Sequence, residues 1–154
     1  MTYIGDNPSN GAVPLTEFPS DDDAGIAELQ SAGLVGAETD TKTLRDWIFG
    51  KQANGDNRTW LMAEPLHSSP QAISYAPPEF NDDGTVKTPA LSKLFFGAND
   101  GLLRMINAES GQEEWAFLPQ ELFGIQADLM KNANDFTGES HIYGIDGTPV
   151  FLDK

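Results

Sequence analysis

The stretch that most restricts the fold is "KLFFGANDGLLRMINAESGQEEWAF", which occupies residues 93–117. Apolar and polar residues alternate along three short segments, and a polar residue followed by glycine separates each segment from the next. This pattern is typical of antiparallel strands joined by tight turns. It predicts three consecutive strands at about 93–98, 102–107 and 113–118.

The glycines between these strands indicate how the chain reverses. Asp100-Gly101 suits a two-residue turn in which both residues have positive φ. Glu109-Ser110-Gly111 suits a longer turn, with the glycine in the left-handed conformation. Asn99 and Asp100 are therefore interpreted as turn formers and not as ligands of a metal or a substrate.

A further strand is predicted ahead of these three, and a strand pair behind them. "SSPQAISY" supplies a strand through residues 72–75, and a long connection follows because "APPEFNDDGTVKTPA" holds several residues that break regular structure. "HIYGIDGTPVFLDK" begins a strand pair that turns at Asp146-Gly147, with its last strand near 148–152. A four-stranded antiparallel unit over 71–118, followed by the opening of a second, is the pattern of consecutive blades in a β-propeller.

The predicted fold class is therefore mainly β with a few helices. It comprises one β-propeller blade plus the start of the next, preceded by a short helical segment, and a small α+β domain is the alternative. Because a propeller needs several blades to close, we expect the chain to be a fragment of a longer protein. The expected division is an extended and helical lead-in over residues 1–60 and a partial propeller over 61–154.

Three helices are predicted from caps and apolar stripes, after an extended, loosely held stretch at 1–20. The first starts at the acidic cap Ser20–Asp23 and closes at Gly33, and the second starts at Asp40 and Thr41 and stops at Gly50. The third begins at Pro119. The stripe residues are Ile26 and Leu29 in the first helix, Leu44, Trp47 and Ile48 in the second, and Leu122, Ile125 and Leu129 in the third.

Composition excludes several classes of function. The 154 residues carry 24 Asp and Glu against 9 Lys and Arg, a formal net charge of -15, with the cations scattered singly. This argues against binding to nucleic acid or to an anionic membrane surface. The absence of cysteine excludes disulfides and thiolate metal sites. No apolar run approaches the ~20 residues of a membrane span, and the first residues lack the features of a secretory signal, so an exported parent would carry its signal upstream.

Three motifs together resemble a known family. Gly97-Ala98-Asn99-Asp100-Gly101, followed by "LLRMINAESGQEEW", resembles the quinoprotein-like β-propeller repeat. With "LHSSPQAISY" at 66–75 and "IYGIDGTPVFLD" at 142–153, the order of segments over roughly 40–154 looks like the propeller domain of the PilC/PilY-type adhesins found at the tips of bacterial type IV pili. One departure is Ala63-Glu64-Pro65, which stands where the family usually has a Gly-Asp pair.

The resemblance implies a function in pilus biogenesis and surface adhesion, exercised by a non-catalytic binding scaffold. It implies partners among the minor pilins at the pilus tip and on a host or abiotic surface. The implied location is exported, at the cell surface or pilus tip of a Gram-negative bacterium and associated with the outer membrane. Two alternatives share the propeller repeat: a pyrroloquinoline-quinone-dependent dehydrogenase and a periplasmic scaffold propeller.

Candidate chemical groups are few, and we expect no catalytic, cofactor-binding or metal-binding residue in this chain. His67, Ser68 and Ser69 suggest a nucleophile and a base, but neighbouring strand residues point to opposite faces and no orienting third group is visible. The same alternation separates Glu113 from Glu114. Calcium loops place oxygen ligands at alternate positions, which neither "SDDDAG" nor "NDDGT" does. A calcium site, if the full-length parent has one, is expected beyond Lys154.

Two further groups are weighed against structural roles. Trp115 could stack on a quinone or a sugar, but an aromatic residue at this place in a blade is expected to pack between sheets. Glu139 and His141 share a face at a strand start, where they supply too few ligands for a metal site.

Overall fold

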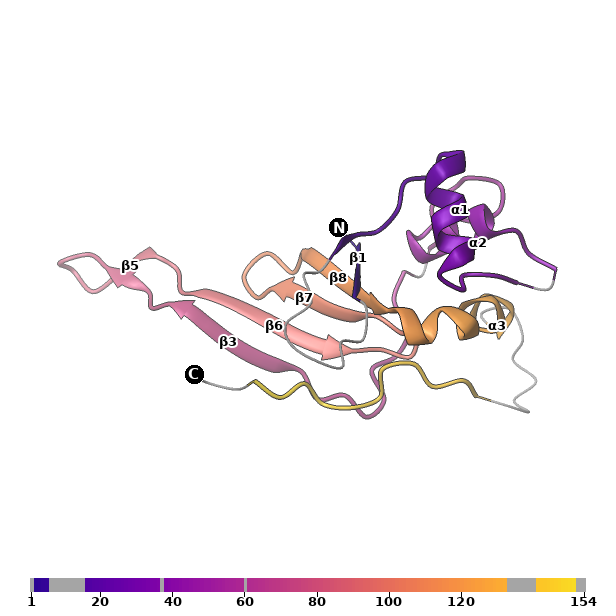
Figure 1. The fold of residues 1–154 in the computed structure, drawn as a ribbon. Coiled ribbons are helices and arrows are strands. Elements are labelled where there is room, and N and C mark those ends of the chain that lie inside the picture. Colours follow the sequence, from indigo (N-terminus) through magenta and orange to yellow (C-terminus); the bar gives the residue numbers. More distant parts are fainter. Residues whose placement is uncertain (1, 6–15, 37, 60, 133–140, 152–154) are drawn as a thin grey trace.

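A six-stranded sheet forms the centre of the protein. The structure is a computed structural model that describes residues 2–5, 16–36, 38–59, 61–132 and 141–151. The strand order is β2-β1-β8-β7-β6-β3 (Figure 1). The strands are β1 Thr2–Gly5, β2 Thr16–Glu17, β3 Gln71–Ala76, β6 Leu91–Gly97, β7 Leu103–Asn107 and β8 Glu113–Pro119.

Strands β3, β6, β7 and β8 make the four-stranded antiparallel unit that the sequence predicts. Phe95 pairs with Met105, which pairs with Trp115, so these three side chains share one face of the sheet. The unit is confirmed as a meander of three consecutive strands with β3 added beside β6. Its identity as a propeller blade stays a prediction.

The N-terminal strands differ from the prediction of loosely held chain at 1–20. β1 lies parallel to β8, with Tyr3 opposite Phe117, and β2 pairs antiparallel with β1. "TYI" contains β-branched and aromatic residues that favour strands, and β8 offers an unpaired edge on the side away from β7. The pairing partner lies more than a hundred residues away, so no local sequence pattern predicts this pairing.

The turn between β6 and β7 also differs from its prediction. Gly101 has a φ of 86°, but no other residue type in the described part of the chain has positive φ, so Asp100 does not take the positive φ predicted for it. The amide of Gly101 donates to the carbonyl of Ala98 at 3.0 Å, and the amide of Leu102 donates to the Asp100 carboxylate at 3.2 Å. The side chain of Asp100 thus holds a turn in which glycine alone is left-handed.

A hairpin stands in the connection that the sequence analysis interpreted as a long loop. β4 Glu79–Phe80 and β5 Val86–Thr88 pair antiparallel, around a turn with Gly84 at a φ of 82°. Figure 1 shows this hairpin projecting beyond the ends of β3 and β6. All of its residues are exposed.

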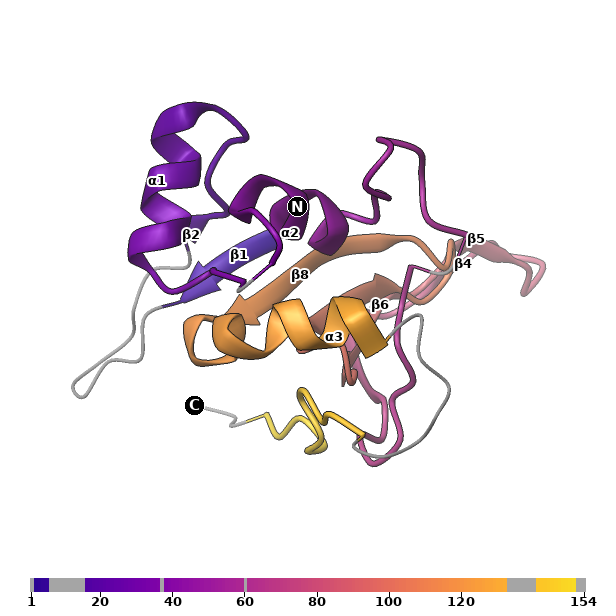
Figure 2. The same ribbon diagram turned by 90° about the vertical axis from the view of Figure 1, so that its right-hand side faces the viewer.

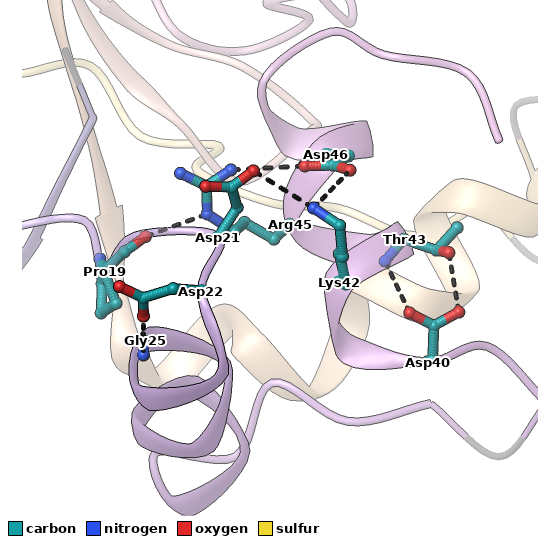
Figure 3. A network of polar contacts seen from close by, with 9 residues as sticks. All are labelled: Pro19, Asp21, Asp22, Gly25, Asp40, Lys42, Thr43, Arg45 and Asp46. Atoms are coloured by element: carbon teal, nitrogen blue, oxygen red, sulfur yellow. Dashed lines mark hydrogen bonds and ion pairs between the residues drawn. The ribbon is translucent and has the colours of Figure 1, made fainter. Parts of the chain in front are cut away.

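Helices α1 Asp23–Ser31 and α2 Thr41–Ile48 form as predicted. Figure 3 shows the two caps: Asp22 accepts from the amide of Gly25 at 2.8 Å, and Asp40 accepts from the amide of Thr43 at 2.9 Å. The acidic stretch before α1 is therefore a cap, and Asp21 pairs with Lys42 of α2 at 3.2 Å.

The third helical segment is split, and its predicted stripe is partly wrong. A 3-10 helix, η1 Gln120–Ile125, precedes α3 Gln126–Asn132. A 3-10 helix turns about 20° more per residue than an α-helix, which changes the residues that face the core. Leu129 is buried as predicted, but Leu122 and Ile125 are only half-buried, whereas Phe123 and Gln126 are each 1% exposed.

One apolar core joins the helices to one face of the sheet. Ala116 and Leu118 of β8 pack in the same cluster as Leu44 and Trp47 of α2 and Phe123 of η1. Residues 141–151 run along the other side of the sheet (Figure 2). They contain no strand, so the strand pair predicted there is not present within the described residues, where no further strand is available to pair with it. No helix in the described ranges is long and apolar enough to cross a bilayer.

Candidate functional site

Segment 141–148 meets residues 64–69 and the β6–β7 turn at a site that we call the junction. The amide of Ile145 donates to the carbonyl of Ala98 at 3.1 Å. A Cβ on Gly144 would lie 2.4 Å from the backbone nitrogen of Gly101, and a Cβ on Gly97 would lie 2.2 Å from a methyl carbon of Ile145. Only glycine at these two positions lets the segments approach so closely.

Both histidines of the chain lie in the junction, and both contact the ring of Tyr143. His67 stacks on the Tyr143 ring at 6.0 Å, and His141 meets it edge-on at 4.7 Å. Each imidazole also contacts a carboxylate. His67 Nδ1 lies 2.6 Å from Asp146 Oδ1, and His141 Nε2 lies 3.0 Å from Glu64 Oε1. The pairs are about half exposed, so they position the segment more than they stabilise the fold.

The two serines beside His67 serve as anchors. Ser68 is buried, and its hydroxyl accepts a hydrogen bond from the amide of Gly97 at 2.8 Å. The amide of Ser69 donates to the hydroxyl of Thr148 at 3.0 Å. In the part of the chain that the structure describes, no hydrogen bond joins His67 to either serine.

Asn99 links the turn to both sides of the junction. Its amide nitrogen Nδ2 lies 3.2 Å from Glu64 Oε1 and 3.1 Å from His141 Nε2, and its backbone amide donates to the carbonyl of Glu64 at 3.2 Å. Hydrogen bonds from the backbone amide of Glu64 itself and from Asn99, together with the nearby charge of His141, outweigh desolvation and lower the pKa of the Glu64 carboxyl. Glu64 is therefore ionised at neutral pH.

Asp100 and Arg104 form a buried ion pair on the opposite side of the sheet from Trp115. The two terminal guanidinium nitrogens of Arg104 lie 2.9 and 2.7 Å from the Asp100 carboxylate, and Arg104 Nε lies 2.9 Å from Glu113. Burial acts to lower the pKa of Arg104, but the hydrogen bonds and charges of Asp100 and Glu113 outweigh it, and the pKa is raised. The side chains of Asp100 and Arg104 are engaged in holding the turn.

The remaining candidate residues have structural partners. Glu114 contacts Lys93 and Asn107, whereas Glu113 contacts Arg104, so the two glutamates act on different faces as predicted. Glu139 lies outside the described residues. Within the described ranges, no three His, Cys, Asp or Glu side chains are close enough to hold a metal ion.

The second candidate surface is the sheet face opposite the helices, which we call the open face. Pairing and alternation place five half-buried apolar side chains on it. They are Ile73, Leu103, Met105, Trp115 and Phe117. Phe151 meets the ring of Phe95 in β6 edge-on at 4.9 Å, and Phe95 meets Trp115 edge-on at 6.0 Å. Trp115 is thus half-buried against Phe95 on this face, and its packing between two sheets stays a prediction.

Comparison with known proteins adds one relationship. The chain is similar to the type IV pilus biogenesis factor PilY1 of Pseudomonas aeruginosa (strain UCBPP-PA14), with 34% identity over 133 residues that cover 75% of this chain. The chain spans 11% of the length of that protein. No family model matches the chain. No solved structure matches it either.

Proposed function

We propose that this chain, which is homologous to the type IV pilus biogenesis factor PilY1, is a non-catalytic binding module of a pilus-associated protein. The observation that supports the proposal is the 34% identity across three quarters of the chain. That relationship confirms the resemblance to the PilC/PilY-type proteins that the motifs around His67, Asp100 and Gly144 indicate. The activity of the whole parent protein is part of the proposal, because the chain matches a small share of the relative.

The structure supports a binding module because the polar side chains that could take part in a reaction have structural partners. Ser68, Asp100 and Arg104 are buried in contacts that hold the sheet and its turns. In this respect the molecule resembles a binding scaffold more than it resembles an enzyme. The proposed partners are minor pilins at the pilus tip and a host or abiotic surface, and the proposed location is the exterior of the cell, at the pilus tip or the outer membrane.

The four-stranded unit is proposed to be one blade of a β-propeller. The open face supports this, because apolar residues on a sheet are stabilised by a second layer, and propeller blades pack face to face. The half-buried residues Ile73, Met105 and Trp115 would then be covered by a neighbouring sheet of the parent protein.

The alternative of a quinone-dependent dehydrogenase lacks support from the blade. An anionic quinone needs free cationic groups, and the sequence offers Arg104 and little else near the blade. Arg104 is 4% exposed, and its guanidinium is held by Asp100 and Glu113.

The proposal is tested by removing residues 61–151 in frame from the gene that encodes them. We expect fewer surface pili, measured after shearing from cells, and weaker attachment to an abiotic surface. Export of the shortened protein is monitored by immunoblot, and a strain restored with the full gene is the control. Normal pili and normal attachment, with the shortened protein exported at the normal level, would refute the proposal.

A further inference from the structure

Three side chains from distant segments converge in the junction with nearly equal separations. His141 Nε2 lies 3.0 Å from Glu64 Oε1, Asn99 Nδ2 lies 3.1 Å from His141 Nε2, and Asn99 Nδ2 lies 3.2 Å from Glu64 Oε1. The three polar atoms therefore form a triangle with sides near 3 Å. The residues come from positions 64, 99 and 141, so the triangle joins three parts of the chain.

Hydrogen bonds alone cannot satisfy this triangle. An amide nitrogen only donates, a carboxylate oxygen only accepts, and Nε2 does one or the other. When Nε2 of His141 is bare, it faces Glu64 as a second acceptor, and when it carries a proton, it faces Asn99 as a second donor. One side of the triangle is mismatched in either state.

A cation removes the mismatch. The amide of Asn99 can be rotated by half a turn, which exchanges its oxygen and nitrogen. Its oxygen then takes the corner, so His141 Nε2, Glu64 Oε1 and Asn99 Oδ1 can each offer a lone pair to one ion. Adjacent ligands lie about 3.0–3.1 Å apart in an octahedral site with bonds of about 2.1–2.2 Å, and about 3.3–3.4 Å apart in a tetrahedral zinc site with bonds of about 2.0–2.1 Å. The observed separations match the octahedral spacing and lie about 0.2–0.3 Å below the tetrahedral one, a difference that small side-chain movements on binding would close.

We propose that Glu64, Asn99 and His141 bind a divalent first-row transition-metal ion such as Zn²⁺, with water as the remaining ligands. An imidazole nitrogen selects this class of ion, whereas Ca²⁺ prefers six to eight oxygens. The ion would tie residue 141 to residues 64 and 99. This site is distinct from any calcium loop elsewhere in the parent, and it does not depend on the proposed function.

Three features of the surroundings favour a bound cation. Glu64 and His141 each have side chains 48% exposed, which gives an ion and its water ligands access from solvent. Asn99 is 3% exposed and is fixed by its backbone bond to Glu64, so one ligand is held in place before binding. The net charge of -15 attracts cations generally.

The test is calorimetric titration of the full 154-residue chain with zinc chloride. We expect saturable binding of one ion per chain and an increase in the melting temperature with zinc, because an ion that binds only the folded state stabilises it. His141→Gln and Glu64→Gln should each weaken binding by at least about tenfold, since even residues that merely support metal ligands change affinity by about 10–100-fold. Both positions are half exposed, so these variants should fold.

The other histidine supplies the matched control. His67 also faces a carboxylate, Asp146, but no third ligand joins that pair in the described part of the chain. His67→Gln should therefore leave zinc affinity within about twofold. The proposal is overturned if no saturable heat is seen, if His141→Gln binds zinc as the parent sequence does, or if His67→Gln weakens binding equally.

Discussion

The buried ion pair of Asp100 and Arg104 gives the sharpest quantitative prediction for the sheet. Arg104→Met keeps much of the side-chain volume but removes the cation, so the Asp100 carboxylate stays in a nearly closed site. Two backbone amides, those of Ala63 and Leu102, would still donate to it, each at 3.2 Å. Because breaking a buried pair on one side leaves an uncompensated charge, we expect a loss of about 3–5 kcal/mol in the free energy of unfolding.

Urea unfolding followed by circular dichroism measures this loss. Lys87→Met is the matched control, because Lys87 pairs with Glu79 at 3.2 Å while both side chains are more than 60% exposed. Removal of an exposed pair should change stability by less than about 1 kcal/mol. A double variant, Asp100→Asn with Arg104→Met, should lose clearly less than the sum of the two single variants. If Arg104→Met costs no more than Lys87→Met, the pair is solvated and the reasoning fails.

Three further predictions concern the helices and the junction. Phe123→Ala should cost about 3–5 kcal/mol of unfolding free energy and Leu122→Ala clearly less, because only Phe123 is fully buried; equal losses in urea unfolding would contradict the split helix. Gly144→Ala should release residues 141–148 from the turn, because its Cβ would meet backbone atoms; faster proteolysis of that segment measures the release, and unchanged proteolysis would show that the backbone adjusts. A hydrogen bond from the side chain of Thr43, and a second one from its backbone amide, lower the pKa of Asp40. The stability that ionised Asp40 adds is therefore present above the ordinary pKa of an aspartate. It is lost as the pH falls through the lowered pKa of the folded state. Asp40→Ala should cost about 1 kcal/mol at neutral pH, and in an acid titration of helicity Asp40→Asn should remove the pH dependence while keeping the cap.

Features that depend on neighbouring residues could be predicted from the sequence. The caps Asp22 and Asp40 bond backbone amides three residues ahead, so the start of each helix is encoded within one turn. The three strands over 93–118 are joined by turns whose glycines, Gly101 and Gly111, do take positive φ. Local chemistry is sufficient in these places because the interacting groups are close in the chain.

Strand pairing at long range was less accessible. β1 pairs with β8 across most of the sequence, and nothing in "TYIG" specifies a parallel partner. The hairpin of β4 and β5 left a weak signal, because Asn81–Gly84 suits a turn and Phe80 and Val86 flank it as a cross-strand pair. The change from 3-10 to α geometry at Gln126 left no signal in the sequence. Gln126 is buried because its amide donates to the carbonyl of Asp100 at 3.2 Å, and that contact spans 26 residues.

The junction shows why a motif can be recognised before its role is understood. In "GANDG" the positions of Asn99 and Gly101 fit a turn, and the turn is what forms. The side chain of Asn99, however, acts on Glu64 and His141, which are 35 and 42 residues away. The segment around Ser68 likewise leads into strand β3, yet the hydroxyl of Ser68 accepts a hydrogen bond from the amide of Gly97. Each motif therefore determines the local backbone structure, whereas its side chains contact another motif. The three motifs together make one site. Prediction of such a site requires the fold first, because no spacing within one motif reveals the others.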